Sequence, residues 1–263
     1  MSGTGLEGLE PLLVVLAGLG AGIATSSIGV ASLVSFPVLI ALGVPPVAAS
    51  SSNTVGLVPA GVSGTFGYRR ELAGRRGLAW SVVLLSGTFA VAGALLLLRL
   101  PSEVFESLVP WLILFACSLV ATQPRISAFL RRRKEARTGA EVVGDRAAMT
   151  PALAAGTAAC GVYGGYFGAG QGVMMVAVLA FGLDLSLGVV SALRTLAVFA
   201  SNVVATVVFL FIAPLQWDVI ALLAAGSVVG GWIGAQIGRH LPDRIFRALV
   251  VIAGVAVAVG SWV

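Results

Sequence analysis

One arginine stands alone in a long hydrophobic stretch of this sequence. Arg194 lies within SLGVVSALRTLAVFASNVVATVVF, where no other residue is charged. An arginine in the middle of a membrane segment costs about 3 kcal/mol or more, so it is expected to face a cavity or a partner. Carboxylates such as Asp184 and Asp218 stand at the ends of apolar segments, closer to water. An anionic ligand would therefore explain Arg194, and the alternative is a side chain that extends to the membrane surface.

Uncharged polar residues accompany this arginine in both halves of the chain. The first half carries SSSNT, residues 50–54, five successive polar residues inside an apolar stretch. Such residues either bond to neighbouring backbone or line a wet cavity. Asn53 aligns approximately with Ser191 of the second half, and Asn202 follows Arg194 on the same stretch. The hydrogen-bonding candidates for an anion are Ser52, Asn53, Thr54, Ser191 and Asn202.

Glycine is concentrated in CGVYGGYFGAGQGVMM, residues 160–175, again inside an apolar run. Glycine permits backbone conformations that are closed to other residues, and it lets helices pack closely. At the start of a helix it also presents free N–H groups beside the positive end of the dipole, where an anion binds. Close packing alone is the alternative. The candidates at this turn and its first-half counterpart are Gly29, Ser32, Gly168, Gly170 and Gln171, with Tyr163 as a lining residue.

The composition places these residues in a membrane. Of the 263 residues, 58% are hydrophobic and 10% are charged, whereas soluble domains carry about a quarter charged residues. A helix that crosses about 30 Å of hydrocarbon needs roughly 20 apolar residues. The sequence therefore predicts an all-α polytopic membrane protein. The apolar runs are 11–28, 30–43, 46–67, 77–99, 104–123, 149–167, 169–182, 185–213, 217–238 and 244–262.

The two halves of the chain share one pattern. Gly22, Gly29 and Gly43 recur 139 positions later, as Gly161, Gly168 and Gly182. We therefore predict two repeats of about five hydrophobic segments each. The second run of each repeat is too short to span the membrane, and it is expected to be a broken or re-entrant helix near the midplane. The predicted divisions are a first transmembrane repeat, 1–123, a basic linker, 124–148, and a second transmembrane repeat, 149–263.

Loop charges predict that the repeats are inverted. YRRELAGRR, residues 68–76, is basic and is expected in the cytoplasm, as is the central linker. The equivalent second-half loop, IAPLQWD, has no basic residue and is expected outside, whereas GRHLPDRIFR is basic and is expected inside. An odd number of segments in each half inverts the second repeat, and both chain termini are then expected outside. Inverted repeats are typical of transporters.

Several functional classes are disfavoured by the same residues. Seven of the sixteen basic residues lie between Arg125 and Arg146, which is typical of a topology signal and not of a nucleic-acid surface. The two cysteines, Cys117 and Cys160, have no metal-ligand spacing, and His240 is the one histidine. Neither a proton relay nor a catalytic cluster can be recognised. We expect an anion carrier, not an enzyme, with no cofactor and no metal. The first apolar run, which has no basic residue before it, is expected to stay in the mature protein.

A set of motifs extends over nearly the whole chain. In the first half these are Gly22, Gly29, Pro37, Gly43 and SNTVGLVPAGVSGTFGYRREL. In the second half they are YFGAGQGVMM, SALRTLAVFASNVVATVVF, QWD and GSVVGGWIGAQIGRHLP. In these residues the sequence resembles the sulfite exporter TauE/SafE family. It departs from the family pattern near the proposed site, at Gly29-Val30-Ala31-Ser32, Gln171 and Ser191.

The resemblance implies a secondary transporter that exports or exchanges sulfite, sulfoacetate or related organosulfonates. It implies a multi-pass protein of the bacterial inner membrane whose partners are the anion and the bilayer, and it leaves a homo-oligomer open. Alternating access about a midplane site is the expected mechanism. An anion channel, or an accessory subunit with no transport of its own, stays open as an alternative.

Overall fold

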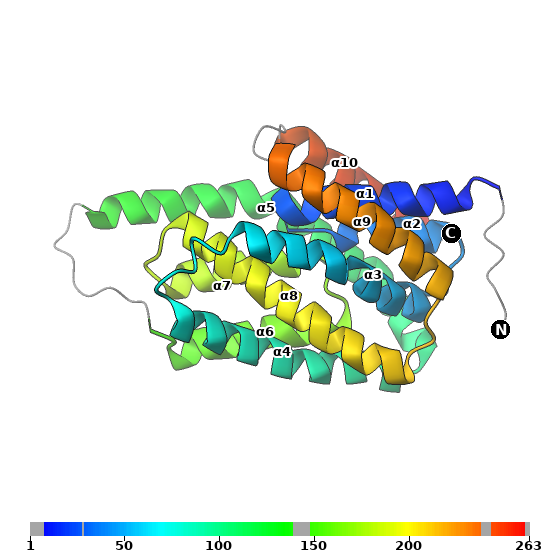
Figure 1. Ribbon diagram of the computed structural model, residues 1–263, viewed down its shortest axis with the longest axis horizontal. Helices are drawn as coiled ribbons and strands as arrows, with labels where there is room; N and C mark the ends of the chain where they lie inside the picture. Colours follow the sequence, from blue (N-terminus) through cyan, green and yellow to red (C-terminus); the bar gives the residue numbers. More distant parts are fainter. Residues whose placement is uncertain (1–7, 28, 139–147, 238–242, 261–263) are drawn as a thin grey trace.

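The computed structural model describes residues 8–27, 29–138, 148–237 and 243–260 (Figure 1). Within these ranges it contains ten helices and no strand, so the prediction of an all-α chain is confirmed. Each predicted apolar run corresponds to one helix. The helices are α1 (Glu10–Ser27), α2 (Ser32–Ala41), α3 (Pro46–Gly67), α4 (Arg76–Arg99), α5 (Ser102–Thr138), α6 (Pro151–Tyr166), α7 (Gln171–Gly182), α8 (Leu187–Ile212), α9 (Trp217–Ile237) and α10 (Asp243–Gly260).

Local sequence signals explain where several helices begin. Pro46 and Pro151 occupy the first turns of α3 and α6, where a missing N–H leaves no hydrogen bond unmade. The Thr150 hydroxyl caps α6 by accepting a hydrogen bond from the Leu153 N–H at 3.3 Å. Ser186 caps α8 in the same manner through the N–H of Val189. The Ser186 cap fixes the start of α8, the helix that carries Arg194.

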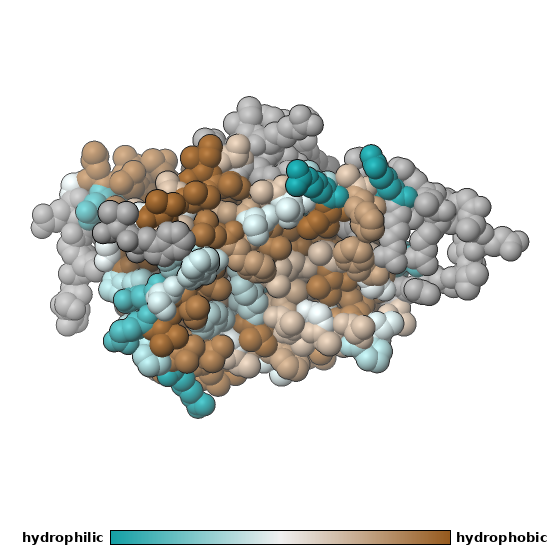
Figure 2. Space-filling view, turned by 180° about the vertical axis from the view of Figure 1, so that it is seen from behind, coloured by the Kyte–Doolittle hydropathy of each residue, from teal (hydrophilic) through white to brown (hydrophobic). Residues whose placement is uncertain are grey.

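Among the described residues, four helical segments are long and apolar enough to cross a membrane: Arg76–Arg99, Ser102–Ile126, Gly188–Ile212 and Trp217–Gly234. Hydrophobic side chains cover most of the middle of the face seen in Figure 2, and the most hydrophilic ones lie toward its edges. Helix α5 continues past the predicted end of the first repeat at residue 123 and runs to Thr138. Residues 139–147 of the predicted linker, residues 238–242 of the basic second-half loop, and both chain termini lie outside the described residues.

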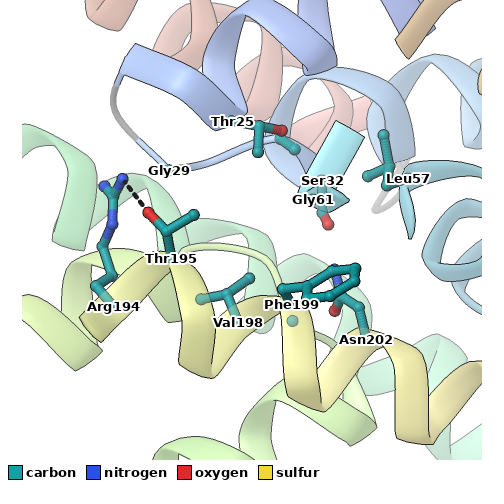
Figure 3. A pocket seen from close by; sticks show the side chains of 12 residues that line it. Thr25, Gly29, Ser32, Leu57, Gly61, Arg194, Thr195, Val198, Phe199 and Asn202 are labelled. Carbon is teal, nitrogen blue, oxygen red and sulfur yellow. Dashed lines mark hydrogen bonds between the residues drawn. The ribbon is translucent and has the colours of Figure 1, made fainter. Parts of the chain in front are cut away.

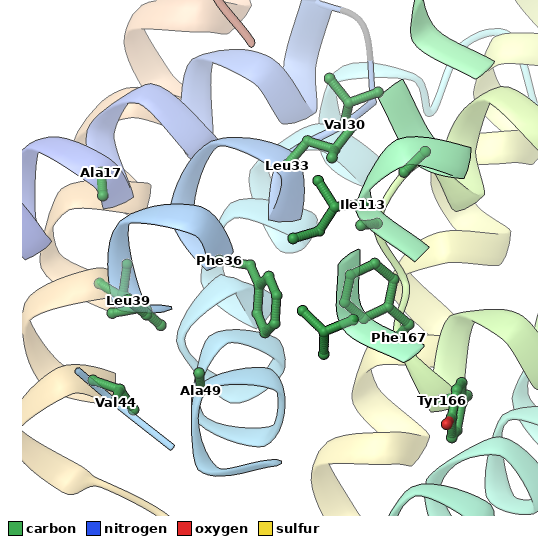
Figure 4. Packing of buried hydrophobic residues seen from close by; sticks show 14 of the residues in the cluster. Ala17, Val30, Leu33, Phe36, Leu39, Val44, Ala49, Ile113, Tyr166 and Phe167 are labelled. Atoms are coloured by element: carbon green, nitrogen blue, oxygen red, sulfur yellow. The ribbon is translucent and has the colours of Figure 1, made fainter. Parts of the chain in front are cut away.

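The short helices α2 and α7 are buried or half-buried except near their ends, where Ala41 and Phe181 are exposed. With 10 and 12 residues, they extend about 15 and 18 Å, roughly half of the hydrocarbon thickness. Phe36 of α2 packs edge-on against Phe167 at 5.1 Å between ring centres, and Leu33 and Ile113 belong to the same large buried cluster (Figure 4). A helix that stops at membrane depth is tolerated where neighbouring protein covers its ends. The prediction that these two runs are short helices is confirmed.

Helices α1 and α9 pack closely because glycine removes the side chains between them. A Cβ added to Gly18 would meet backbone atoms of Leu223, and one added to Gly22 would meet backbone atoms of Ser227. The residue numbers rise together along the contact, so the two helices are parallel. Such close contact of small residues is how membrane helices gain packing energy without a hydrophobic driving force.

Helices α4 and α6 repeat this arrangement. A Cβ added to Gly161 would lie 2.7 Å from the carbonyl oxygen of Ser86, and one added to Gly165 would meet the carbonyl oxygen of Ala90. The residue numbers again rise together. Helices α3 and α8 lie between the α1–α9 pair and the α4–α6 pair and contact each other (Figure 1). The first helix of each half therefore packs against the fourth helix of the other half.

We expect Gly22→Ala and Gly161→Ala to lower stability to a similar degree, by about 1–3 kcal/mol each, because the added methyl group meets backbone that cannot rotate away. Thermal unfolding in detergent measures the effect. Gly77→Ala is the matched control, since a Cβ at that helical glycine has no atom within 4 Å. Equal unfolding temperatures for all three variants would contradict this account of the two interfaces.

Candidate functional site

The turns at Gly29 and Gly168 end the preceding helices in the same way, although they start the next helix differently: Ala31 before α2 is right-handed, and Gly170 before α7 is left-handed. Helix α1 ends before Gly29 and helix α6 ends before Gly168, and these glycines have φ angles of +77° and +74°. The Gly29 N–H donates to the Ala24 carbonyl at 2.7 Å, and the Gly168 N–H donates to the Tyr163 carbonyl at 3.0 Å. Each bond closes a helix end through a left-handed residue, a position that glycine fills without strain. The chain can then start a new short helix inside the protein.

These turns lie against each other, although they are far apart in the sequence. A Cβ added to Gly172, in the first turn of α7, would lie 2.5 Å from the carbonyl oxygen of Gly29. The start of α7 therefore packs directly on the turn between α1 and α2. No side chain at residue 172 fits between the start of α7 and the turn at Gly29, so this close approach requires glycine there.

Arg194 reaches this place from α8. Its side chain is 4% exposed, and a Cβ added to Gly29 would lie 2.8 Å from the central carbon of the guanidinium group. One terminal nitrogen donates to the Thr195 hydroxyl at 3.2 Å (Figure 3). The guanidinium thus lies beside the first-half turn because glycine leaves room for it. The side chain is buried among protein groups in this structure, and its contact with an anion stays a prediction.

A small pocket of about 40 Å³ opens beside this arginine. In Figure 3, side chains of α8 lie along one side of the pocket, and the turn after α1, the start of α2 and helix α3 lie opposite. Arg194 carries the one formal charge among the described lining residues. The lining residues are Thr25, Gly29, Ala31, Ser32, Leu57, Gly61, Gly168, Arg194, Thr195, Val198, Phe199 and Asn202.

The pocket brings together five of the twelve residues that the sequence singled out: Gly29, Ser32, Gly168, Arg194 and Asn202. Sequence reasoning missed Thr25, Ala31, Leu57, Gly61, Thr195, Val198 and Phe199. Helical spacing could have predicted the missed residues of α8. Arg194, Val198 and Asn202 are four residues apart and share one face of α8, and Thr195 and Phe199 form the adjacent row.

Three candidates from the first half lie outside the pocket lining and have partners of their own. The Asn53 side-chain oxygen accepts a hydrogen bond from the Ser35 hydroxyl of α2. The Ser52 hydroxyl accepts from the Gln216 N–H at 3.0 Å, and the Thr54 hydroxyl donates to a carbonyl one turn earlier in α3. These contacts fit the alternative in which the SSSNT stretch bonds to neighbouring groups. A direct role of Ser52, Asn53 and Thr54 in anion binding stays a prediction.

Gln171, a fully buried residue, joins three helices. Its side-chain nitrogen donates to the Cys160 carbonyl of α6 at 3.0 Å and to the Ser201 hydroxyl of α8 at 3.1 Å. Gly164 leaves the room that the Gln171 amide occupies. In these contacts Gln171 fixes the start of α7 relative to the helix that carries Arg194, and its direct contact with an anion stays a prediction.

The remaining candidates, Tyr163, Gly170 and Ser191, are not among the lining residues of the pocket. The Tyr163 hydroxyl donates to the Ala169 carbonyl at 2.6 Å and so closes the turn between α6 and α7. Gly170 precedes α7 with a φ angle of +77°. The Ser191 carbonyl accepts from the Thr195 hydroxyl at 2.9 Å. The roles of Tyr163, Gly170 and Ser191 in binding stay predictions.

In the described part of the chain, no group of three or more histidine, cysteine, aspartate or glutamate residues could hold a metal ion. The pocket combines one buried cation with small polar groups, the start of α2 and Gly168 of the turn before α7. This arrangement suits a small anion that accepts several hydrogen bonds.

Comparison with known proteins agrees with this description. The family described as "Sulfite exporter TauE/SafE" matches residues 14–261. A probable membrane transporter protein, ORF9, of Sinorhizobium sp is 27% identical over 244 residues, which cover 91% of this chain and 87% of the relative. A probable membrane transporter protein of Haemophilus influenzae is 24% identical over 224 residues, 85% of this chain and 83% of the relative. No solved structure matches the chain.

Proposed function

This chain belongs to the sulfite exporter TauE/SafE family, and on that premise we propose that it exports or exchanges small sulfur-containing anions, sulfite foremost, by alternating access. It is a multi-pass membrane transporter and not an enzyme. The observation that carries the proposal is the buried Arg194 guanidinium, which lines a pocket of a few water volumes between two broken helices.

The chemistry of the pocket favours an oxyanion. A guanidinium group is planar and can donate two parallel hydrogen bonds to two oxygens of one anion. Ser32 and Asn202 add a hydroxyl and an amide from opposite sides. The start of α2 also borders the pocket, where the positive end of the helix dipole favours an anion. Sulfite, with three oxygens and a formal double charge, can accept from all of these donors.

The size of the pocket favours the smaller members of the proposed substrate class. A water molecule needs roughly 10–15 Å³ of such space, so about 40 Å³ accommodates a solute of a few heavy atoms. Sulfite fits this description more closely than sulfoacetate, which adds a carboxymethyl group. We therefore place sulfite before the longer sulfonates in the order of preference.

The proposed mechanism uses two inverted repeats that rock about this pocket. The left-handed glycines at the turns of both halves, Gly29 and Gly168, support this proposal. So does the packing between the halves, in which α1 contacts α9 and α4 contacts α6. Parallel packing within each pair suits halves that are related by an axis in the membrane plane. The basic loop at residues 68–76 and the central linker are then cytoplasmic and the chain termini are outside, as the loop charges predict.

Sulfite counterflow in proteoliposomes tests this function. Vesicles loaded with unlabelled sulfite are expected to accumulate labelled sulfite transiently, at a rate that saturates with concentration. The reason is that a carrier which releases unlabelled sulfite outside returns inward with labelled sulfite bound. With the membrane potential held at zero by valinomycin and equal potassium concentrations on both sides, an anion channel would show no such accumulation, and its flux per molecule would be far higher. Absence of flux with sulfite and with sulfoacetate would contradict the proposed substrate class.

A further inference from the structure

A second and much larger cavity, of about 970 Å³, lies on the side of the protein between the end of α3, the following loop, α4 and α8. We call it the lateral groove. Unlike the pocket beside Arg194, it is lined mainly by hydrophobic side chains. Its lining residues are Thr65, Phe66, Arg69, Leu72, Ala73, Arg76, Ala79, Trp80, Val83, Leu84, Gly87, Thr88, Val91, Leu196, Phe199, Ala200, Val203 and Val204.

The charge of the lateral groove is gathered at one end. Arg69 belongs to the loop after α3 and Arg76 begins α4, and both side chains are exposed. No acidic residue is among the described lining residues. Beside them stand Phe66 and Trp80, which are 65% and 64% exposed. Aromatic residues next to basic ones are typical of the level where a helix leaves the hydrocarbon and meets lipid headgroups.

The dimensions match a lipid chain. The candidate membrane span of α4 starts at Arg76, and the groove follows this helix as far as Val91. Fifteen residues of helix extend about 22 Å, and one leaflet of the hydrocarbon core is about 15 Å thick. The groove therefore begins at the headgroup level, where its charge lies, and continues through the depth of one leaflet, where its lining is apolar.

From this arrangement we propose that the lateral groove binds an anionic phospholipid. The phosphate lies between Arg69 and Arg76, and an acyl chain follows α4 and α8 past Trp80. Each basic residue near an anionic headgroup strengthens lipid binding. Two such residues together are expected to give a roughly ten- to thirtyfold preference for an anionic lipid over a zwitterionic one. A zwitterionic lipid fills the apolar part equally well but brings its own cation to the two arginines, so it is not retained with the same preference.

This site adjoins the anion pocket through one shared residue. Phe199 lines both cavities, and Figure 3 shows its ring on the α8 side of the pocket. A Cβ added to Gly61 would lie 2.6 Å from that ring, so α3 holds Phe199 closely. An acyl chain in the groove thus packs on the outer side of a wall whose inner side faces the pocket. The lipid site does not depend on which anion the transporter carries.

Quenching of Trp80 fluorescence by lipids with brominated chains tests the proposal. Brominated phosphatidylglycerol is expected to quench the purified protein at a roughly ten- to thirtyfold lower concentration than brominated phosphatidylcholine. The Trp80→Phe variant identifies the part of the signal that arises in the groove. The double variant Arg69→Gln/Arg76→Gln is expected to lose the preference while quenching by phosphatidylcholine is unchanged.

Arg70→Gln/Arg75→Gln is the matched control, because these two arginines belong to the same loop but do not line the groove. The control is expected to keep the preference. Equal quenching by the two lipids, no quenching of Trp80, or an equal loss in both double variants would overturn the proposal. Glycerol phosphate, at matched ionic strength, is expected to have no effect; if it displaced the lipid at millimolar concentration, the arginines would belong to a soluble phosphate site instead.

Discussion

Replacement of Arg194 by glutamine is expected to lower sulfite transport about a hundredfold in proteoliposomes, because two charge-assisted hydrogen bonds to the anion are lost. Glutamine keeps polarity and much of the length of the side chain. It removes the charge and the forked pair of donors. Initial rates of labelled sulfite uptake, at equal amounts of reconstituted protein, measure the effect.

Two further variants separate charge from geometry. Arg194→Lys keeps the positive charge but donates from a single point, so an intermediate rate is expected, about tenfold below that of the unchanged protein. Arg99→Gln removes the same charge from the exposed end of α4 and is expected to transport normally. Normal uptake by a folded Arg194→Gln protein would remove the arginine from the site and leave the helix starts as the anion's ligands.

Gly29→Ala is expected to reduce sulfite transport about tenfold or more, although it adds one methyl group. A Cβ at this position would overlap the Arg194 guanidinium, which must then move away from the pocket. The displacement costs at least one charge-assisted hydrogen bond to the anion. The positive φ angle adds a backbone strain of about 1–2 kcal/mol, which lowers stability as well.

The effect of strain alone can be measured at another glycine. Gly43 also has a φ angle of +77°, but a Cβ there meets no atom within 4 Å. Gly43→Ala is therefore expected to lower the unfolding temperature by as much as the backbone strain at residue 29 does. It is expected to leave sulfite transport close to normal. Equal transport by the Gly29→Ala and Gly43→Ala proteins would show that contact between residue 29 and Arg194 has no functional weight.

Much of the fold could be predicted because its signals are local. The third apolar run, predicted at 46–67, is α3 with the same bounds, since Pro46 starts it and the polar loop at residues 68–76 follows it. The short runs at 30–43 and 169–182 are the short helices α2 and α7. Hydropathy, proline and glycine influence the backbone within a few residues, so a single sequence is sufficient to predict these helices.

The same local information does not tell where a polar side chain points. Asn53 and Asn202 are both asparagines in apolar helices, yet Asn202 lines the pocket and Asn53 accepts a hydrogen bond from Ser35. Gln171 follows the glycine turn in the sequence but bonds to α6 and α8. Which face of a helix meets a cavity depends on how neighbouring helices are packed around it. The sequence of the helix alone does not contain that arrangement.

By itself the sequence determined the membrane class, the succession of helices, the two glycine breaks and the isolated arginine, because each of these follows from composition or short-range backbone preference. Tertiary structure decided that Gly29, Gly172 and Arg194 meet at one point, and that Phe199 separates the pocket from the lateral groove. These residues belong to separate helices, and contacts between helices depend on close packing of the whole bundle. The pocket beside Arg194 exists only once that packing has closed around the buried charge.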